Sequence, residues 1–294
     1  MEKYSVYMSV YVKENPEYFY KSVESMINQT IKPDEIIIVC DGPLTEELDT
    51  VLSDFCTKYP FIKAIRLEEN KGRSYAAQVG LNACSNEIVL RMDSDDISLP
   101  YRAQVSLEAL KNCDIVGGVI AEFDGDVKNI TGLRVLPCEH NDIVKFSKKR
   151  SPINNVTVAL KKSVIEKIDG YNVNLKYAED YFLWVKAIQN GAICKNLNYI
   201  FVYVRAGKDM ALRRNNEFYK STKDLRKYML KTKYINVFQY ITYNLCQWIV
   251  FHMPNSFKLW FYKTFLRKKA NKIKDSDFLY NERDEKNENS SHGC

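Results

Sequence analysis

The chain has 294 residues, of which 46% are apolar and 27% charged, so it can bury the core of one large α/β domain, and global disorder is excluded. Its net charge of +6 is mild, with 43 basic and 37 acidic side chains. No run of 18 apolar residues predicts a membrane span, and the N-terminal MEKYSVYMSVYVKEN lacks the pattern of a secretory signal.

Strand-like and helix-like segments alternate along the first part of the chain. Apolar, β-branched runs predict strands over residues 4–11, 35–40, 61–67, 87–92 and 114–120. Helical spacing predicts helices over residues 16–27, 45–59, 74–83 and 99–110. This alternation indicates a parallel sheet with right-handed crossovers, in which ligands bind beyond the carboxyl ends of the strands.

Three carboxylates, Asp93, Asp95 and Asp96, follow the fourth predicted strand. They would repel one another strongly if unpaired, so the loop needs a compensating charge. A Mg²⁺ or Mn²⁺ ion that bridges carboxylates to substrate phosphates would provide it. The alternative is that an Asp or Ser of this run caps the helix that begins near Leu99. Asp41 follows the second strand, so we expect it at the same rim of the sheet.

Four motifs occur in order: MSVYVKENPEYFYKSVESMINQT, PDEIIIVCDGPLT, LEENKGRSYAAQVGLNACSNEIVLRMDSDDISLP and KYAEDYFLWVKAIQNG. On these motifs the chain resembles the family 2 glycosyltransferases over roughly residues 4–215. The resemblance is greatest to the bacterial branch that builds capsule, O-antigen and exopolysaccharide, including amylovoran-type enzymes. It implies a GT-A fold, which is an α/β fold with a Rossmann-like, mostly parallel sheet flanked by helices. It also implies a catalytic domain over residues 1–215, with a nucleotide-sugar half of about 1–120 and an acceptor half of about 121–215.

The same resemblance implies nucleotide binding at several strand ends and in the loop before the helix over 74–83. The matching residues are Ser9, Val10, Tyr11, Asp41, Asn70, Lys71, Arg73, Asp93 and Ser94. Asp93 and Asp95 match the DxD motif of the family, with Asp95 as the direct ligand of Mn²⁺ or Mg²⁺ and Asp93 nearer the ribose. The physical reading agrees, because a divalent ion would stabilise the charge that develops on a departing nucleotide diphosphate.

Glu179 and Asp180, at the start of a predicted helix over residues 178–190, match the catalytic carboxylates of the family, with Asp180 as the general base. A carboxylate within reach of an acceptor hydroxyl can take its proton as the oxygen attacks the anomeric carbon. A single displacement of this kind inverts the anomeric configuration. The structural alternative is that acids in the first turn simply favour the helix macrodipole.

The stretch VYVRAGKDMALRRN departs from the family, because many relatives carry a His there after a Tyr-Arg pair. Its cations are candidates for contacts to the diphosphate, since Arg can bind phosphate with two hydrogen bonds, and a solvated basic loop is the alternative. These cations are Arg205, Lys208, Arg213 and Arg214. Asn155 is a candidate contact to the acceptor.

The positive charge is concentrated near the C-terminus. Residues 220–274 hold 13 basic residues against one acidic residue, together with twelve of the 37 aromatics. Between Lys233 and Lys258, apolar and polar side chains fall on opposite sides of a helical wheel. We therefore expect residues 216–270 to form an amphipathic helical extension that associates with an anionic membrane surface. The alternative is a helical pair whose apolar face packs on the catalytic domain.

Together with the basic C-terminal segment, the resemblance implies an inverting, metal-dependent glycosyltransferase that moves a sugar from a UDP-sugar to a hydroxyl of a lipid-linked saccharide. Eight cysteines without a CxxC pair, together with such an acceptor, indicate a cytoplasmic protein, peripheral on the inner face of the plasma membrane. Nucleic acid is disfavoured as a partner, because the aromatics gather on an apolar face. Residues 271–294 are polar and are expected to be disordered. Two alternatives stay open: a nucleotidyltransferase acting on sugar phosphates, and a non-catalytic, membrane-bound module that binds sugar nucleotides.

Overall fold

The structure is a computed structural model that describes residues 2–175, 177–205, 216–253 and 278. Its strands are β1 (Tyr4–Val10), β2 (Glu35–Cys40), β3 (Ile62–Arg66), β4 (Ile88–Asp93), β5 (Ile97–Ser98), β6 (Ile115–Phe123), β7 (Ile130–Arg134), β8 (Ala159–Lys161) and β9 (Cys194–Arg205). Its helices are α1 (Pro16–Ile27), α2 (Glu46–Lys58), α3 (Arg73–Ala83), α4 (Arg102–Leu110), α5 (His140–Ser147), α6 (Lys162–Glu166), α7 (Glu179–Gln189), α8 (Asn216–Lys231) and α9 (Val237–His252), with a 3₁₀ turn η1 (Asn155–Thr157). Within the described residues, no helix has the length and hydropathy needed to cross a bilayer.

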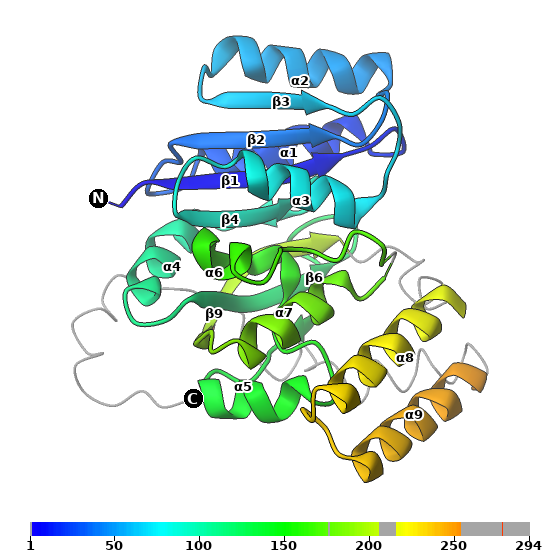
Figure 1. Ribbon diagram of the computed structural model, residues 1–294. Helices are drawn as coiled ribbons and strands as arrows, with labels where there is room; N and C mark the ends of the chain where they lie inside the picture. The colour runs from blue at the N-terminus through cyan, green and yellow to red at the C-terminus, as the bar shows by residue number, and fades with distance from the viewer. Residues whose placement is uncertain (1, 176, 206–215, 254–277, 279–294) are drawn as a thin grey trace.

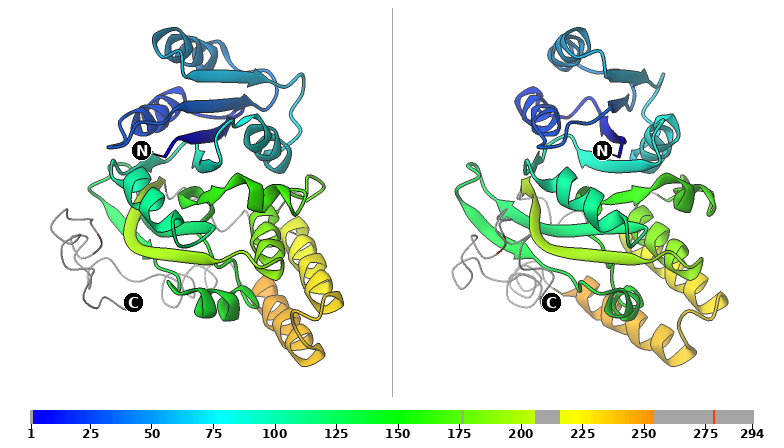
Figure 2. Two further views of the ribbon diagram at one scale, coloured as in Figure 1. Left: turned by 60° about the vertical axis from the view of Figure 1, so that its left-hand side comes forward. Right: turned by 90° about the vertical axis from the view of Figure 1, so that its left-hand side faces the viewer.

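The expected α/β architecture is confirmed in the N-terminal half. Strands β3, β2, β1 and β4 lie side by side in that order, and all three pairings are parallel. Alternate residues of a strand point to opposite faces of a sheet. Val6 accordingly packs in one apolar cluster with Phe19 of α1, whereas Tyr7 packs in a second cluster with Ala76 of α3 and Trp184 of α7. Figure 2 shows α1 and α2 on one side of these strands and α3 on the other.

The sheet continues into the second half through a short antiparallel strand. β8 pairs antiparallel with β4 on one side and with β6 on the other, and β6 then pairs parallel with β9. The full order is β3-β2-β1-β4-β8-β6-β9-β5, with β7 beside β6. The predicted fifth strand is therefore present as β6, but it joins the parallel part through a strand of three residues that has no periodic pattern of its own. The long β9 curves across this half of the molecule (Figures 1 and 2).

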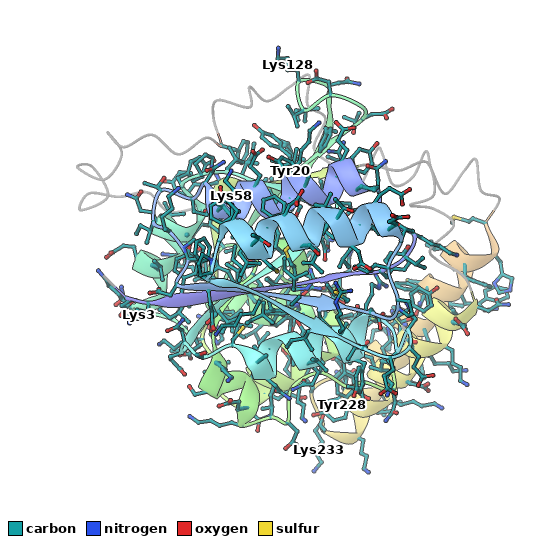
Figure 3. The ribbon with its side chains drawn as sticks, turned by 90° about the horizontal axis from the view of Figure 1, so that it is seen from above. Lys3, Tyr20, Lys58, Lys128, Tyr228 and Lys233 are labelled. Atoms are coloured by element: carbon teal, nitrogen blue, oxygen red, sulfur yellow. The ribbon has the colours of Figure 1, made fainter. Side chains whose placement is uncertain are left out.

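The helices α8 and α9 lie side by side at one corner of the molecule (Figure 1). Leu225 and Met229 of α8 pack with Tyr181 and Val185 of α7 in a separate apolar cluster. Seen from above, Tyr228 and Lys233 of this corner lie at the edge opposite Lys128, which lies in the turn between β6 and β7 (Figure 3). The helical extension expected after the catalytic domain is thus present over the described residues 216–253.

Most of the described cysteines are free thiols. Free thiols are found at Cys40, Cys56, Cys84, Cys113, Cys194 and Cys246. Cys138 is disulfide-bonded, which the spacing of the cysteines did not predict.

Candidate functional site

The carboxyl ends of β1, β2 and β4 bring most of the predicted nucleotide-binding residues to one rim. In the register of the sheet, Ser9 lies beside Asp93, and Val10 lies beside Cys40. The amide of Asp41 donates to the carbonyl oxygen of Val10 at 2.8 Å, which fixes the start of the loop after β2. Tyr11, the next residue after β1, exposes 42% of its surface at this rim, so its ring is available to a ligand.

Asp41 holds the loop before α3 in place. Its buried carboxylate accepts hydrogen bonds from the backbone amides of Lys71 at 2.7 Å and Gly72 at 3.0 Å. The side-chain amide of Asn70 donates to the carbonyl oxygen of Asp41 at 3.2 Å. The loop passes so close to Gly42 that a Cβ there would lie 2.8 Å from the amide nitrogen of Asn70. Asp41 therefore joins two of the predicted nucleotide-binding segments into one unit.

Asp93 is paired with an arginine that was not among the predicted site residues. Nη2 of Arg91, two residues earlier on β4, lies 2.5 Å from Oδ1 of Asp93. Burial lowers the pKa of Arg91, but the charge of Asp93, followed by the phenols of Tyr171 and Tyr7, outweighs it and raises that pKa overall. Arg91 stays charged and orients Asp93 at the rim. The signal that points to it is a cation inside an otherwise apolar strand, directly before the acidic run.

The acidic run does not cap the next helix, so that alternative reading is wrong. The N-cap of α4 is Tyr101, and Ile97 and Ser98 form the short strand β5 between the run and the helix. The side chain of Ser94 is buried and donates to Oε2 of Glu14 at 2.6 Å. Ser94 thus points toward the loop before α1.

Arg205, the last residue of β9, clamps the acidic run. Its amide donates to Oδ1 of the buried Asp96 at 3.0 Å, and its Nε donates to the carbonyl oxygen of Asp95 at 3.0 Å. Its guanidinium carbon lies 3.7 Å from the ring centroid of Tyr18 and 4.9 Å from that of Phe123. Arg205 therefore stabilises the conformation of the loop that carries Asp95 and Asp96. The other predicted cations, Lys208, Arg213 and Arg214, lie outside the described residues.

Glu179 and Asp180 form the first turn of α7. The residue before them, Ala178, is the N-cap of the helix and has a left-handed backbone conformation, with a φ of 58°. Glu179 is buried, and this burial, followed by the charge of Asp180, raises its pKa. The cations of Arg73 and Arg91 oppose that rise. Arg73 follows the loop that Asp41 holds, and Arg91 pairs with Asp93. The positive charges beside these two predicted nucleotide-binding segments therefore also act on the first turn of α7. Asp180 is the half-buried and more accessible member of the pair.

Hydrogen bonds connect the segment before α7 to the N-terminal half. The hydroxyls of Tyr7 and Tyr171 lie 2.8 Å apart in the core, and Ser74 of α3 donates to the carbonyl oxygen of Leu175 at 2.5 Å. These contacts hold the predicted base against the strands that carry the predicted nucleotide site. The structure thus brings the two sets of carboxylates into one region.

Asn155 lies in η1, which follows the buried Asn154. Oδ1 of Asn155 is buried without a hydrogen-bond partner among the described residues. Asn154 has a structural role instead, because its amide donates to the carbonyl oxygens of Gly118 at 2.8 Å and Arg134 at 3.1 Å. Oδ1 of Asn154 is likewise buried without a hydrogen-bond partner among the described residues, so an unpaired side-chain oxygen does not distinguish the two neighbours.

The donor atoms at the rim fit a divalent cation that shares its ligands with a phosphate group. Across the described part of the chain, no group of three His, Cys, Asp or Glu side chains is placed to enclose a metal. Asp93 and Asp95 offer hard carboxylate oxygens instead, and Mg²⁺ and similar ions commonly take one or two carboxylates together with substrate phosphates. Asp96 is excluded from this set by its burial and its bond to the Arg205 amide.

Comparison with known proteins identifies the family of the chain. The profile named "Glycosyl transferase family 2" matches residues 5–168. An Escherichia coli protein named UDP-Gal:alpha-D-GlcNAc-diphosphoundecaprenol beta-1,3-galactosyltransferase is 34% identical over 90% of this chain and 97% of its own length. The amylovoran biosynthesis glycosyltransferase AmsE of Erwinia amylovora is 34% identical over 85% of this chain and 94% of its own.

Solved structures share the fold. Residues 1–349 of TarS from Staphylococcus aureus, in complex with UDP-GlcNAc, superpose with a TM-score of 0.61 at 20% identity over 78% of this chain. This chain spans 66% of that fragment and 40% of a longer TarS chain. The mannosyltransferase PcManGT of Pyrobaculum calidifontis, in complex with GDP-Man and Mn²⁺, gives a TM-score of 0.61 at 13% identity over 87% of this chain and 72% of its own. These likenesses confirm the expected GT-A fold, and the chain belongs to glycosyltransferase family 2.

Proposed function

We propose that the protein is an inverting, metal-dependent glycosyltransferase of bacterial surface polysaccharide synthesis. It transfers a sugar from a UDP-sugar to a hydroxyl of a lipid-linked saccharide. The observation that carries the proposal is the pairing of Arg91 with Asp93 at the end of β4, together with the hydrogen bonds from Tyr7 and Ser74 that hold the segment before the Glu179–Asp180 turn against the same half of the molecule. The two bacterial relatives, which this chain covers almost completely, support the substrate class.

The donor binds along the rim of β1, β2 and β4. Ser9, Val10 and the exposed ring of Tyr11 contact the nucleoside, together with Asp41 and the loop over residues 70–73 that it holds. Asp95, with Asp93 beside it, would hold Mn²⁺ or Mg²⁺, which when bound acts as a Lewis acid on the diphosphate. Arg91 keeps Asp93 oriented for this task.

The acceptor hydroxyl gives up its proton to Asp180. A raised pKa makes Glu179 the carboxyl that more readily keeps its own proton, which reduces repulsion between the two neighbours. Asp180, the more accessible of the pair, then receives the acceptor proton as the oxygen attacks the anomeric carbon. Asn155, in η1, is the proposed contact to the acceptor. Because the acceptor is lipid-linked, the enzyme works in the cytoplasm at the inner face of the plasma membrane.

A screen of sugar nucleotides with Mn²⁺ or Mg²⁺ tests this proposal, with thermal stabilisation and hydrolysis of the donor as readouts. Asp95→Asn is expected to reduce metal-dependent hydrolysis at least a hundredfold. Asp180→Asn is expected to keep donor-induced stabilisation but to lose transfer to the acceptor. Asp142→Asn, in an exposed ion pair with Lys145 on α5, is the matched control and should behave as the unaltered protein.

Three outcomes would contradict the proposal. If Asp95→Asn and Asp180→Asn both retain full turnover, the mechanism is wrong. Tight donor binding without turnover on any acceptor would indicate a non-catalytic binding module. Release of diphosphate from a nucleoside triphosphate would indicate a nucleotidyltransferase.

A further inference from the structure

Helix α9 presents its apolar side to solvent. It has no Lys, Arg, Asp or Glu, and six of its large apolar side chains are between 44% and 78% exposed. These residues form the α9 stripe: Val237, Phe238, Ile241, Leu245, Trp248 and Ile249. At 100° per residue they occupy one arc of the helix, since they recur at intervals of three and four. A contiguous exposed patch of this kind marks an interaction surface.

The polar side of α9 faces inward and fixes this orientation. Arg226 of α8 is buried, and its Nη1 donates to Oδ1 of Asn244 at 3.3 Å and to the side-chain oxygen of Gln247. Gln247 in turn donates to the hydroxyl of the buried Thr222. Turning the stripe inward would leave the Arg226 guanidinium buried without partners, which is far more costly than the present arrangement.

The inward side of α9 also reaches the helix that carries the predicted base. Tyr240 and Tyr243 pack against the cluster that Tyr181 and Val185 of α7 form with α8. Glu179 and Asp180 form the first turn of that same α7. In Figure 1, α8 and α9 lie on the side of the molecule toward which the arrowheads of β1, β2 and β3 point. One packed cluster therefore connects the inward side of α9 to the helix whose first turn carries Glu179 and Asp180.

The composition around the stripe favours lipid over protein as its occupant. Lys231 and Lys233 are exposed directly before α9, and Lys233 projects at the edge of the molecule in Figure 3. Residues 220–274, which include α9 and most of α8, hold 13 basic residues and one acidic residue. Lysines are depleted in protein–protein interfaces, whereas an apolar face with Trp and Phe bordered by lysines is typical of a helix lying in a membrane interface. Anionic headgroups complement this charge.

We propose that the α9 stripe lies in the headgroup region of an anionic membrane, parallel to its surface, and that the Arg226 network keeps the catalytic domain at a fixed tilt above it. This inference deepens the proposed function, because it names the surface that brings Asp180 to a lipid-linked acceptor. It does not depend on which sugar is transferred.

Flotation of the full chain with vesicles tests this inference. One set of vesicles is pure phosphatidylcholine and the other contains 30% phosphatidylglycerol. We expect the protein to float with the anionic vesicles, and the double variant Ile241→Asn/Ile249→Asn to bind them at least tenfold more weakly. The control is Ile193→Asn/Val173→Asn, which removes two exposed aliphatic side chains outside α9 and should float as the unaltered protein.

The design separates this inference from the proposed function. Hydrolysis of the sugar nucleotide is measured in parallel without vesicles, where the α9 double variant should match the unaltered protein. If that double variant floats as well as the control, the stripe is not the membrane contact, whatever the hydrolysis shows. If the unaltered protein is a dimer in solution and the double variant is a monomer, the occupant is a second copy of the chain and the inference is wrong.

Discussion

Arg91 and Asp93 form an ion pair along β4, with Nη2 and Oδ1 2.5 Å apart and the arginine side chain buried. Replacing Arg91 by Met leaves Asp93 without its partner at the rim. We expect the free energy of unfolding to fall by about 1–3 kcal/mol, because a charged hydrogen-bonded partner is lost. Donor hydrolysis should fall at least tenfold, because the carboxylate is no longer oriented.

An exposed ion pair provides the control for the buried pair of Arg91 and Asp93. Arg66 and Asp49 form an exposed ion pair at 2.6 Å, and exposed pairs contribute less than about 1 kcal/mol. Arg66→Met should therefore change the urea midpoint little and leave hydrolysis intact. Equal losses in the two variants would show that Arg91 has no special role.

Arg205→Lys tests the clamp on the acidic run. Lysine keeps the charge but loses both the Nε donor to the Asp95 carbonyl and the flat group that stacks on Tyr18. We expect a higher concentration of Mn²⁺ or Mg²⁺ for half-maximal hydrolysis, by about tenfold. Tyr18→Phe keeps the ring face and should leave the metal titration unchanged; a shift there as large as that of Arg205→Lys would refute the stacking argument.

Gly42→Ala is expected to disturb the loop that Asp41 holds. Gly42 has a φ of +88°, which costs an L-residue about 1–2 kcal/mol, and its new Cβ would meet the Asn70 amide nitrogen at 2.8 Å. Gly125 has a φ of +71°, but a Cβ there has no described atom within 4 Å. Gly125→Ala should therefore show the backbone cost alone. The prediction is that only Gly42→Ala weakens donor binding, as measured by titration calorimetry.

Glu179 and Glu47 both lie in the first turn of a helix, yet they should respond to pH with opposite signs. Burial and then Asp180 raise the pKa of Glu179 above its ordinary 4.5, so the folded protein holds this proton more tightly than the unfolded chain. Its contribution to stability therefore declines as pH rises above 4.5. Glu179→Gln should gain stability relative to the unaltered protein over that range and match it at lower pH.

A hydrogen bond to its own amide, followed by one to Thr45, lowers the pKa of the exposed Glu47. Its contribution is present above pH 4.5 and is lost as pH falls, so Glu47→Gln should be the less stable protein at neutral pH. Thermal melts of both variants from pH 4 to 8 provide the measurement. Shifts of the same sign in the two variants would contradict the role assigned to burial.

The elements with strong local patterns were predictable from the sequence. The apolar run EIIIVC is bounded by turn residues and forms β2 over the predicted residues, and α1 likewise spans residues 16–27 as expected. β5 and β8 were missed because two and three residues carry no periodicity. β5 pairs with β9, and β8 pairs with β4 and β6, so both strands depend on partners that are distant in the sequence.

The candidate site was predictable where residues follow strand ends, as Asp41 and Asp93 do. Arg91 was missed because its role depends on Tyr7 and Tyr171, which approach it only in the folded protein. The helical wheel predicted an apolar and a polar face for α9, but not which of the two faces the rest of the protein. The direction depends on Arg226, a buried cation on the neighbouring helix that needs the polar face of α9.

The clamp at Arg205 has a consequence for how the protein is made. Asp95 leaves the ribosome 110 residues before the side chain that fixes its loop, and the family profile ends at residue 168, well before β9 begins. A nascent chain therefore carries every motif of the donor rim before the acidic loop has its final shape. The acidic loop therefore reaches its final shape only when β9 has inserted between β6 and β5.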